Sequence, residues 1–87
     1  MPGVSRNGVD AAGGTNIAGS DNVFANGAGV VRIGDAVAGH GIAAHAGPVM
    51  AAGSGSVFAN GIGICRAGDP ASCGDADSGS SNVFIGD

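Results

Sequence analysis

The stretch GSDNVFANGAGVVRIGD, residues 19–35, occurs a second time as GSGSVFANGIGICRAGD, residues 53–69. Extended by three residues at the start, the two segments align without gaps over 20 positions, of which 12 are identical. A truncated third copy, GSSNVFIGD, ends the chain at 79–87, and SRNGVD at 5–10 resembles the end of a full unit. A fixed period indicates one architecture built from equivalent parts. We therefore expect three cycles arranged as a pseudo-threefold object.

The arginines and phenylalanines occupy equivalent places in these cycles. Each arginine begins a glycine-containing corner that ends in an aspartate: Arg6 with Asp10, Arg32 with Asp35, and Arg66 with Asp69. Each phenylalanine follows the pattern Gly-Ser-x-x-Val: Phe24, Phe58 and Phe84. We expect the ion pairs to support corners at the surface, where such pairs contribute about 0–1 kcal/mol each. The three phenylalanines are predicted to form a thin ring of core.

The repeated unit predicts an all-β fold of short strands. NVFANG and SVFANG join β-branched and aromatic residues to Asn-Gly, the strongest short hairpin signal, because both residues accept a positive φ. GVVRIGD and GICRAGD then form the return strands, with further turns at the Gly-Asp pairs 34–35 and 68–69. With 19 glycines, a long helix is unfavourable.

Length and composition predict a single domain spanning residues 1–87 with little core. The chain has three phenylalanines and no tryptophan or tyrosine, so we expect a metal, a disulfide or a partner to add stability. A net charge of −4 without a basic cluster argues against nucleic acid as a partner. No apolar run reaches the length of a membrane span, and the start MPGVSRNG lacks a signal-peptide hydrophobic region. We expect synthesis in the cytoplasm, where two cysteines indicate metal binding or free thiols.

The loop between the two full copies of the repeat carries both histidines of the chain. The segment from Asp35 to Gly53 contains His40 and His45, and it is longer than the two equivalent loops, by eight residues in one case and nine in the other. The 34-residue offset aligns Cys73 with the glycine that precedes His40. Threefold folding would bring the two imidazoles and this thiol together at one end, and such groups suit a tetrahedral zinc site.

The fourth ligand of this site has several candidates. Cys65 would complete a set of two histidines and two cysteines, but it aligns with Val31 inside a predicted strand. Buried free cysteines are common and behave as small hydrophobes. Water, Asp75 or Asp77 could fill the position instead.

The ordered series of motifs resembles PAAR-repeat proteins, the tips of type VI secretion spikes and contractile phage tails. The family's Pro-Ala-Ala-Arg tetrapeptide is degenerate here, as GVVR at 29–32 and GICR at 63–66. The surrounding frame is intact, since GS-x-x-VFANG precedes R-x-G-D, and a loop and GS-x-x-VF-x-G-D follow. The resemblance covers essentially the whole chain.

The resemblance implies a small cone of three β-faces with zinc near the vertex. In the family, three histidines and one cysteine typically hold the ion; iron is an alternative metal. His45 in AHAGPV matches the family histidine before Gly-Gly-Pro-Val, and Cys73 in GDPASCG matches the family cysteine. His40 falls near the loop position after the first full Gly-Asp. Ala12 stands where the family often has a further histidine.

The same resemblance implies a structural role for the chain. The base would cap a trimeric β-helical spike, with one otherwise monomeric tip per trimer, and the tip would sharpen the spike against the target cell envelope. No nucleophile–base pair is evident in the sequence, so we expect no catalysis. The end at Asp87 predicts no attached effector, and this feature with the degenerate tetrapeptide favours a phage tail over a secretion spike. The alternatives are a small zinc-binding module without a mechanical role and an adaptor for separately encoded effectors.

Overall fold

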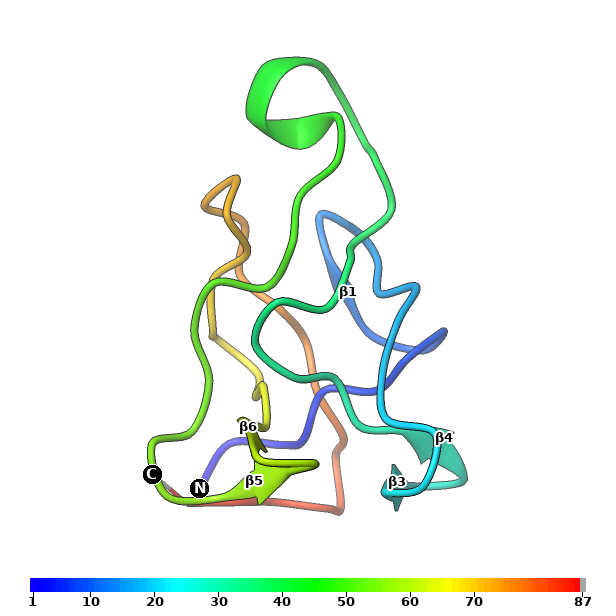
Figure 1. The fold of residues 1–87 in the computed structure, drawn as a ribbon, viewed down its shortest axis with the longest axis vertical. Coiled ribbons are helices and arrows are strands. Elements are labelled where there is room, and N and C mark those ends of the chain that lie inside the picture. Colours follow the sequence, from blue (N-terminus) through cyan, green and yellow to red (C-terminus); the bar gives the residue numbers. More distant parts are fainter. Residues whose placement is uncertain (87) are drawn as a thin grey trace.

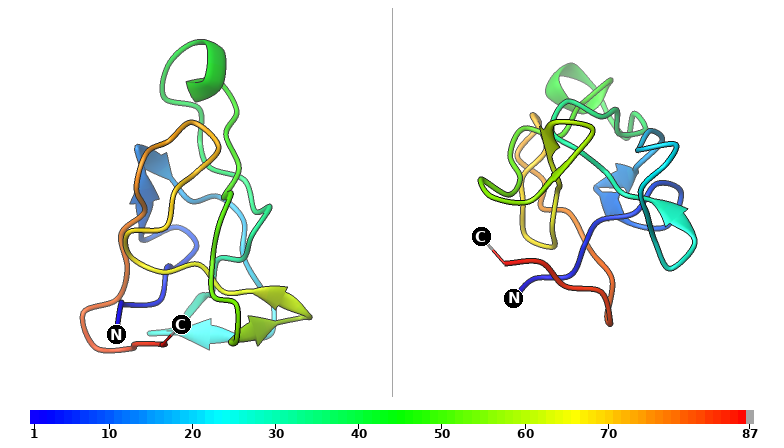
Figure 2. Two further views of the ribbon diagram at one scale, coloured as in Figure 1. Left: turned by 90° about the vertical axis from the view of Figure 1, so that its left-hand side faces the viewer. Right: turned by 60° about the horizontal axis from the view of Figure 1, so that its bottom comes forward.

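A computed structural model describes residues 1–86 and shows a tapered molecule with extents of 32 × 24 × 22 Å (Figures 1 and 2). Asp87, the last residue of the third copy, lies outside the described residues. Three two-stranded antiparallel sheets and one short 3₁₀ turn form the regular structure. In chain order these are β1 (Ala11–Ala12), β2 (Gly14–Thr15), β3 (Phe24–Ala25), β4 (Ala28–Gly29), η1 (Ala43–His45), β5 (Phe58–Ala59) and β6 (Ile62–Gly63).

The two Asn-Gly turns form the predicted hairpins β3–β4 and β5–β6. Both residues of each turn have a positive φ, at 54° and 79° for Asn26 and Gly27 and at 57° and 77° for Asn60 and Gly61. Two consecutive positive φ values define a turn whose twist matches that of the flanking strands. The sequence prediction of these hairpins is confirmed, and both hairpins lie at the broad end of the molecule (Figure 1).

The hairpin of the truncated third copy, equivalent to β3–β4 and β5–β6, is divided between the two ends of the chain. Gly3 pairs with Phe84 in an antiparallel bridge, in the register that β4 and β6 have with Phe24 and Phe58. The N-terminal segment therefore supplies the return strand of the truncated third copy, and both termini lie at the broad end (Figure 1). The same backbone hydrogen bond occurs in all three hairpins: Val30 N to Val23 O, Ile64 N to Val57 O, and Val4 N to Val83 O.

A closed triangle of backbone hydrogen bonds joins the three cycles around a common axis. Ser5 N donates to Cys65 O at 3.0 Å, Cys65 N to Val31 O at 2.8 Å, and Val31 N to Ser5 O at 3.0 Å. These three residues are 0% exposed. The segments that follow Gly29 and Gly63 thus leave their own hairpins and form hydrogen bonds with the neighbouring cycle. This arrangement confirms the pseudo-threefold object expected from the repeat.

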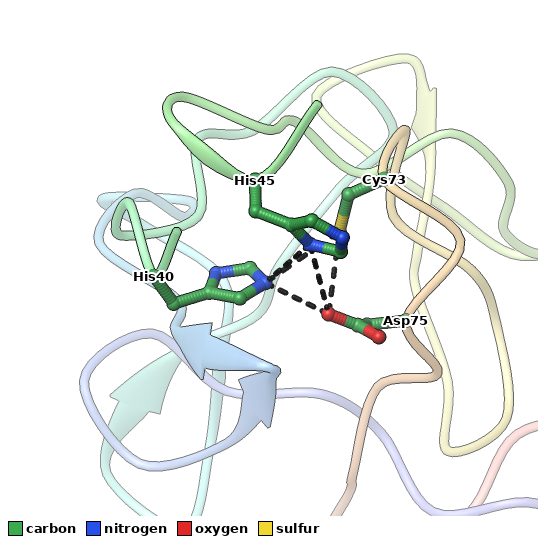
Figure 3. Close-up of side chains that lie close together, drawn as sticks. All are labelled: His40, His45, Cys73 and Asp75. Carbon is green, nitrogen blue, oxygen red and sulfur yellow. Dashed lines mark hydrogen bonds and ion pairs between the residues drawn. The ribbon is translucent and has the colours of Figure 1, made fainter. Parts of the chain in front are cut away.

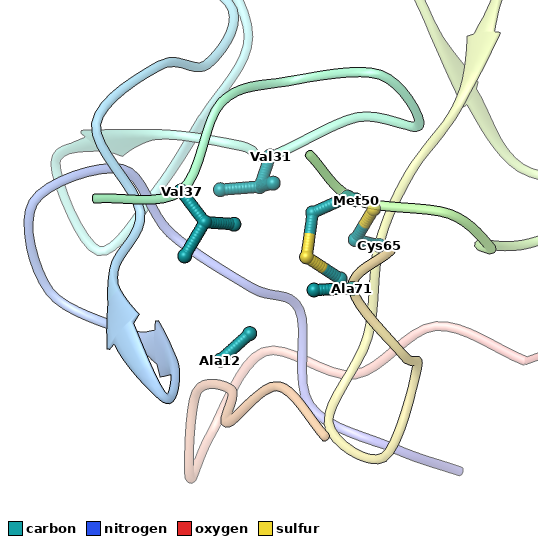
Figure 4. Close-up of a cluster of buried hydrophobic side chains, with 6 residues drawn as sticks. All are labelled: Ala12, Val31, Val37, Met50, Cys65 and Ala71. Carbon is teal, nitrogen blue, oxygen red and sulfur yellow. The ribbon is translucent and has the colours of Figure 1, made fainter. Parts of the chain in front are cut away.

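The core consists of two thin layers of small side chains along this axis. The layer toward the narrow end contains Ala12, Val31, Val37, Met50, Cys65 and Ala71 (Figure 4). The layer toward the base contains Val4, Ala25, Val30, Ala59 and Ile64. Since Met50 is the largest of the fully buried side chains, the core has little apolar volume, as the composition indicates.

The prediction that the phenylalanines form a core ring is wrong. Phe24, Phe58 and Phe84 are 60%, 56% and 48% exposed. Successive strand residues point to opposite faces, so the buried side chains in the two complete hairpins are the neighbouring alanines, Ala25 and Ala59. The three phenylalanines are therefore equivalent, outward-facing groups.

The Arg–Asp sets are corner supports, as expected. Arg Nε lies 2.7, 3.0 and 2.9 Å from a carboxylate oxygen in the pairs of Arg6 with Asp10, Arg32 with Asp35 and Arg66 with Asp69. In each pair the carboxylate also accepts the arginine backbone N–H, which fixes the turn between them. Burial alone would raise the pKa of Asp10, but hydrogen bonds from Arg6 and Ser78 outweigh it and hold that pKa below its ordinary value.

No helix within residues 1–86 has the length and apolar character needed to cross a membrane.

Candidate metal centre

The long loop that carries the histidines forms the narrow end of the molecule (Figures 1 and 2). It begins and ends at the bridge between Ala36 and Val49. His45 is the last residue of η1, and its carbonyl accepts the backbone N–H of His40 at 2.8 Å. A Cβ on Gly39 would overlap the carbonyl oxygen of Ala46, so the two sides of the loop pass close to each other at this point. The backbone thus directs both imidazoles to one side of the loop.

A second, shorter turn faces this loop and carries Cys73 and Asp75. Ala71 N donates to Asp75 O at 2.9 Å, and Gly74 has a φ of 92°, a value that favours glycine. An antiparallel bridge between Pro70 and Ala76 closes the turn. This compact hairpin holds the thiol and the carboxylate on the same side of the backbone.

The four side chains converge on one point (Figure 3). One donor atom from each of His40, His45, Cys73 and Asp75 lies within 4.8 Å of the others. His40 Nε2 is 2.7 Å from Asp75 Oδ2 and 3.1 Å from His45 Nδ1, and Cys73 Sγ is 3.7 Å from His40 Nε2. The structure therefore brings together the two histidines and the cysteine that the repeat offset relates, and it adds a carboxylate.

The hydrogen bonds around His40 direct its Nε2 into the cluster. Nδ1 lies 3.0 Å from the carbonyl oxygen of Ala38, which only accepts, so Nδ1 donates its proton there. Nε2 donates to the Asp75 carboxylate when the ring is protonated, and it is free to bind a metal when the ring is neutral. The hydrogen bond to Ala38 and then that to Asp75 raise the pKa of His40. The hydrogen bond with His40 in turn lowers the pKa of Asp75, which favours the carboxylate form.

The residues present fit a zinc ion. Ligands at about 2.0–2.3 Å from a tetrahedral ion lie roughly 3.3–3.8 Å from one another, a spacing close to that of these donor atoms. Imidazole, thiolate and carboxylate are all established zinc ligands. The backbone hydrogen bond to His40 Nδ1 is the outer contact that metal-binding histidines usually make. The cluster can therefore hold a metal through two nitrogens, one sulfur and one oxygen.

Cys65 lies outside this cluster. It is 0% exposed within the core layer near the narrow end, and its thiol donates to Ala52 O at 3.3 Å. Burial raises the pKa of Cys65 to about 12, so its thiol stays protonated at neutral pH. Its place on the axis, equivalent to Val31, explains this separation. The fourth side chain beside the two histidines and Cys73 is Asp75, not Cys65.

Asp77, the other carboxylate considered from the sequence, is also buried away from the cluster. Its oxygens accept hydrogen bonds from Ser5 Oγ at 2.5 Å and Asn16 Nδ2 at 2.9 Å. Burial raises the pKa of Asp77, and these hydrogen bonds oppose that shift. The side chain thus belongs to a polar group on the axis, whereas Asp75 is partly exposed at the narrow end.

Gly13 is a contributor to the site that sequence reasoning missed. It lies between β1 and β2 with a φ of 82°, and a Cβ there would collide with Asp75 Oδ2 and His40 Nε2. The pair Gly13-Gly14 was visible in DAAGG, but only the fold brings it against the other loops. The neighbouring Ala12 is 0% exposed in the core, so its position offers the cluster no ligand.

Gly13→Ala is expected to weaken zinc binding by at least tenfold, because the added methyl group would displace His40 and Asp75. Gly8→Ala is the matched control, since Gly8 has a similar φ of 76° and open space where a Cβ would stand. Both variants should share the backbone strain, whereas only Gly13→Ala should lose affinity in a chelator-competition titration. Equal affinities of the two variants would contradict this contact.

The two thiols are expected to react differently with a maleimide reagent. In the metal-free protein Cys73, which is partly exposed, should be labelled while buried Cys65 is not. Zinc should then protect Cys73, and Cys73→Ser should remove the labelling altogether. Intact-protein mass spectrometry counts the added groups. Labelling of Cys73 at the same rate with and without zinc would show that the thiol does not bind the metal.

Comparison with known proteins places these features in a family. No curated protein matches the chain. The family described as the PAAR motif matches residues 38–87, which is 50 of the 87 residues. The matched span contains His40, His45, Cys73 and Asp75 together with the second hairpin. The agreement of this match with the repeats and the tapered all-β fold identifies the chain as a member of the PAAR-motif family.

Proposed function

We propose that this chain is the pointed tip of a membrane-piercing spike in a contractile injection machine, either a phage tail or a type VI secretion system. Its broad end would cap a trimeric β-helical spike protein, and its narrow end would lead into the target envelope. The PAAR-motif family is structural rather than enzymatic, and we propose no catalysis for this member. The chain would be made in the bacterial cytoplasm and assembled onto the spike.

The observation that carries this proposal is the exposure of three equivalent phenylalanines. Phe24 and Phe58 belong to the hairpins at the broad end, and Phe84 belongs to the split hairpin there. About half of each residue's surface stays exposed in the monomer, although aromatic side chains dominate the energetics of interfaces. Their pseudo-threefold arrangement matches the symmetry of a trimeric partner, which would offer three identical pockets.

A zinc ion at the narrow end would stabilise the tip. We propose His40, His45, Cys73 and Asp75 as its ligands, with iron as the alternative metal. Bound zinc would cross-link the loop of residues 36–49, here called the apical loop, to the turn of residues 70–76. The core is too thin at this end of the molecule to fix the two segments, so the ion would hold them together. Structural zinc sites of this closed kind contribute folding free energy directly.

Co-expression with a β-helical spike protein encoded nearby tests the proposal. Affinity purification of the spike should recover this chain, and light scattering on the purified complex should give about one tip per trimer. Free elution of the chain beside an intact spike trimer would overturn the capping role. Neighbouring phage structural genes or secretion genes would then identify the machine.

A further inference from the structure

The most exposed large apolar side chain of the described residues stands on the apical loop. Ile42 is 86% exposed, and the adjacent Gly41, Ala43 and Ala44 are also exposed. No Asp, Glu, Lys or Arg occurs in the 30 residues from 36 to 65. Residues 41–44 therefore present one branched aliphatic side chain among small uncharged residues, and the charged groups at this end are those of the cluster, where Asp75 and His45 are partly exposed.

The apical loop satisfies part of its own backbone hydrogen bonding. Ile42 O accepts the N–H of His45 at 3.1 Å, and Ala43 O accepts that of Ala46 at 3.1 Å. The His40–His45 backbone bond closes the loop below them. Unsatisfied backbone groups are the main cost of placing a loop in hydrocarbon, and these bonds reduce that cost.

The shape of this end favours lipid over a protein partner. A specific protein interface buries about 800 Å² on each side. A convex apex of four small or medium residues offers far less area, and it has no charge to add specificity. A bilayer needs no complementary pocket, and its hydrocarbon accepts an aliphatic side chain directly.

We propose that Ile42 is the leading lipid-contacting residue of the tip, which inserts its side chain between the acyl chains of a phospholipid bilayer at first contact. This inference rests on the proposed function, because the spike would bring the narrow end to the membrane first. One aliphatic side chain binds lipid too weakly to hold a free protein on a vesicle. Its effect would appear only when the apex is pressed against the bilayer.

Force spectroscopy on an oriented protein tests this proposal. The zinc-loaded full chain is biotinylated at its N-terminus, which lies at the broad end, and attached to a streptavidin-coated cantilever so that the apex faces outward (Figure 1). It is pressed against a supported dioleoylphosphatidylcholine bilayer. Ile42→Ser should lower the frequency of adhesion on retraction by about tenfold and raise the breakthrough force, because it removes the free energy of burying the side chain. Ile42→Leu should behave like the wild type.

Ile17→Ser is the matched control, since Ile17 is 59% exposed but lies outside the apical loop. It should leave adhesion and breakthrough force unchanged. Equal adhesion by the wild type and Ile42→Ser, with both proteins folded and zinc-loaded, would overturn the inference. That result would leave spike capping intact, whereas failure of spike binding with normal Ile42-dependent adhesion would overturn the proposed function alone.

Discussion

Removal of the proposed zinc ion by a chelator is expected to lower the unfolding midpoint of the protein by about 20 °C or more. The core consists of two thin layers, and the side chains of His40, His45, Cys73 and Asp75 converge at the narrow end. Without the ion, the apical loop and the turn of residues 70–76 lose their cross-link. Differential scanning calorimetry with and without chelator measures the shift.

Two cysteine variants separate the metal from the rest of the core. Cys73→Ala should unfold at the midpoint of the chelated wild type and show no further response to chelator. Cys65→Ala should lose only about 1–2 kcal/mol for the missing buried thiol and should keep its sensitivity to chelator. An unfolding midpoint that chelation leaves unchanged, in protein shown to have contained metal, would contradict a stabilising site.

Replacement of Phe24, Phe58 and Phe84 by serine is expected to weaken binding to the spike trimer by about 1,000-fold. Each exposed ring would fill one pocket of the trimer, and a loss of about 1.4 kcal/mol per ring corresponds to tenfold in affinity. Because the rings are 48–60% exposed in the monomer, the unfolding midpoint of the variant should change little. Biolayer interferometry against the immobilised spike measures the affinity.

Val9→Ser is the control for this experiment, since Val9 is 57% exposed and lies outside the three hairpins at the base. It should bind like the wild type. Undiminished binding by the triple phenylalanine variant would place the spike contact on another face of the molecule.

The repeat determined most of what could be predicted about the fold. Asn-Gly at 26–27 and 60–61 specifies two positive φ values in succession, and this local rule predicts both complete hairpins. The 34-residue offset also relates Cys73 to the histidine loop, because equivalent loops of a threefold object meet at one end. These predictions succeeded because they depend on local backbone preferences and on symmetry.

The remaining features depend on which way a side chain points. Val-Phe-Ala consists of three apolar residues, so the sequence does not show which of them faces the core, and the small Ala25 is buried where Phe24 was expected. The count of two histidines and two cysteines likewise made Cys65 a candidate ligand, although its alignment with Val31 in a predicted strand argued against it, and the structure places its thiol in the core layer. Composition cannot distinguish these orientations.

The least predictable part of the fold is a second set of three equivalent buried positions, besides the triangle of Ser5, Val31 and Cys65. Asn16, Met50 and Asp77 make the same backbone hydrogen bonds in the three cycles, to Asp10 O, Asp35 O and Asp69 O. All three are buried, although two are polar and one is apolar. Because the repeats diverge at this position, alignment gives no signal of the Ser5–Asn16–Asp77 hydrogen bonds that form there.

Native mass spectrometry of the complex with its spike tests the central claim most directly. We expect a mass equal to three spike chains, one copy of this 8.0 kDa chain and about one zinc ion. A complex with three tips per trimer, or a spike trimer that carries no tip, would contradict it.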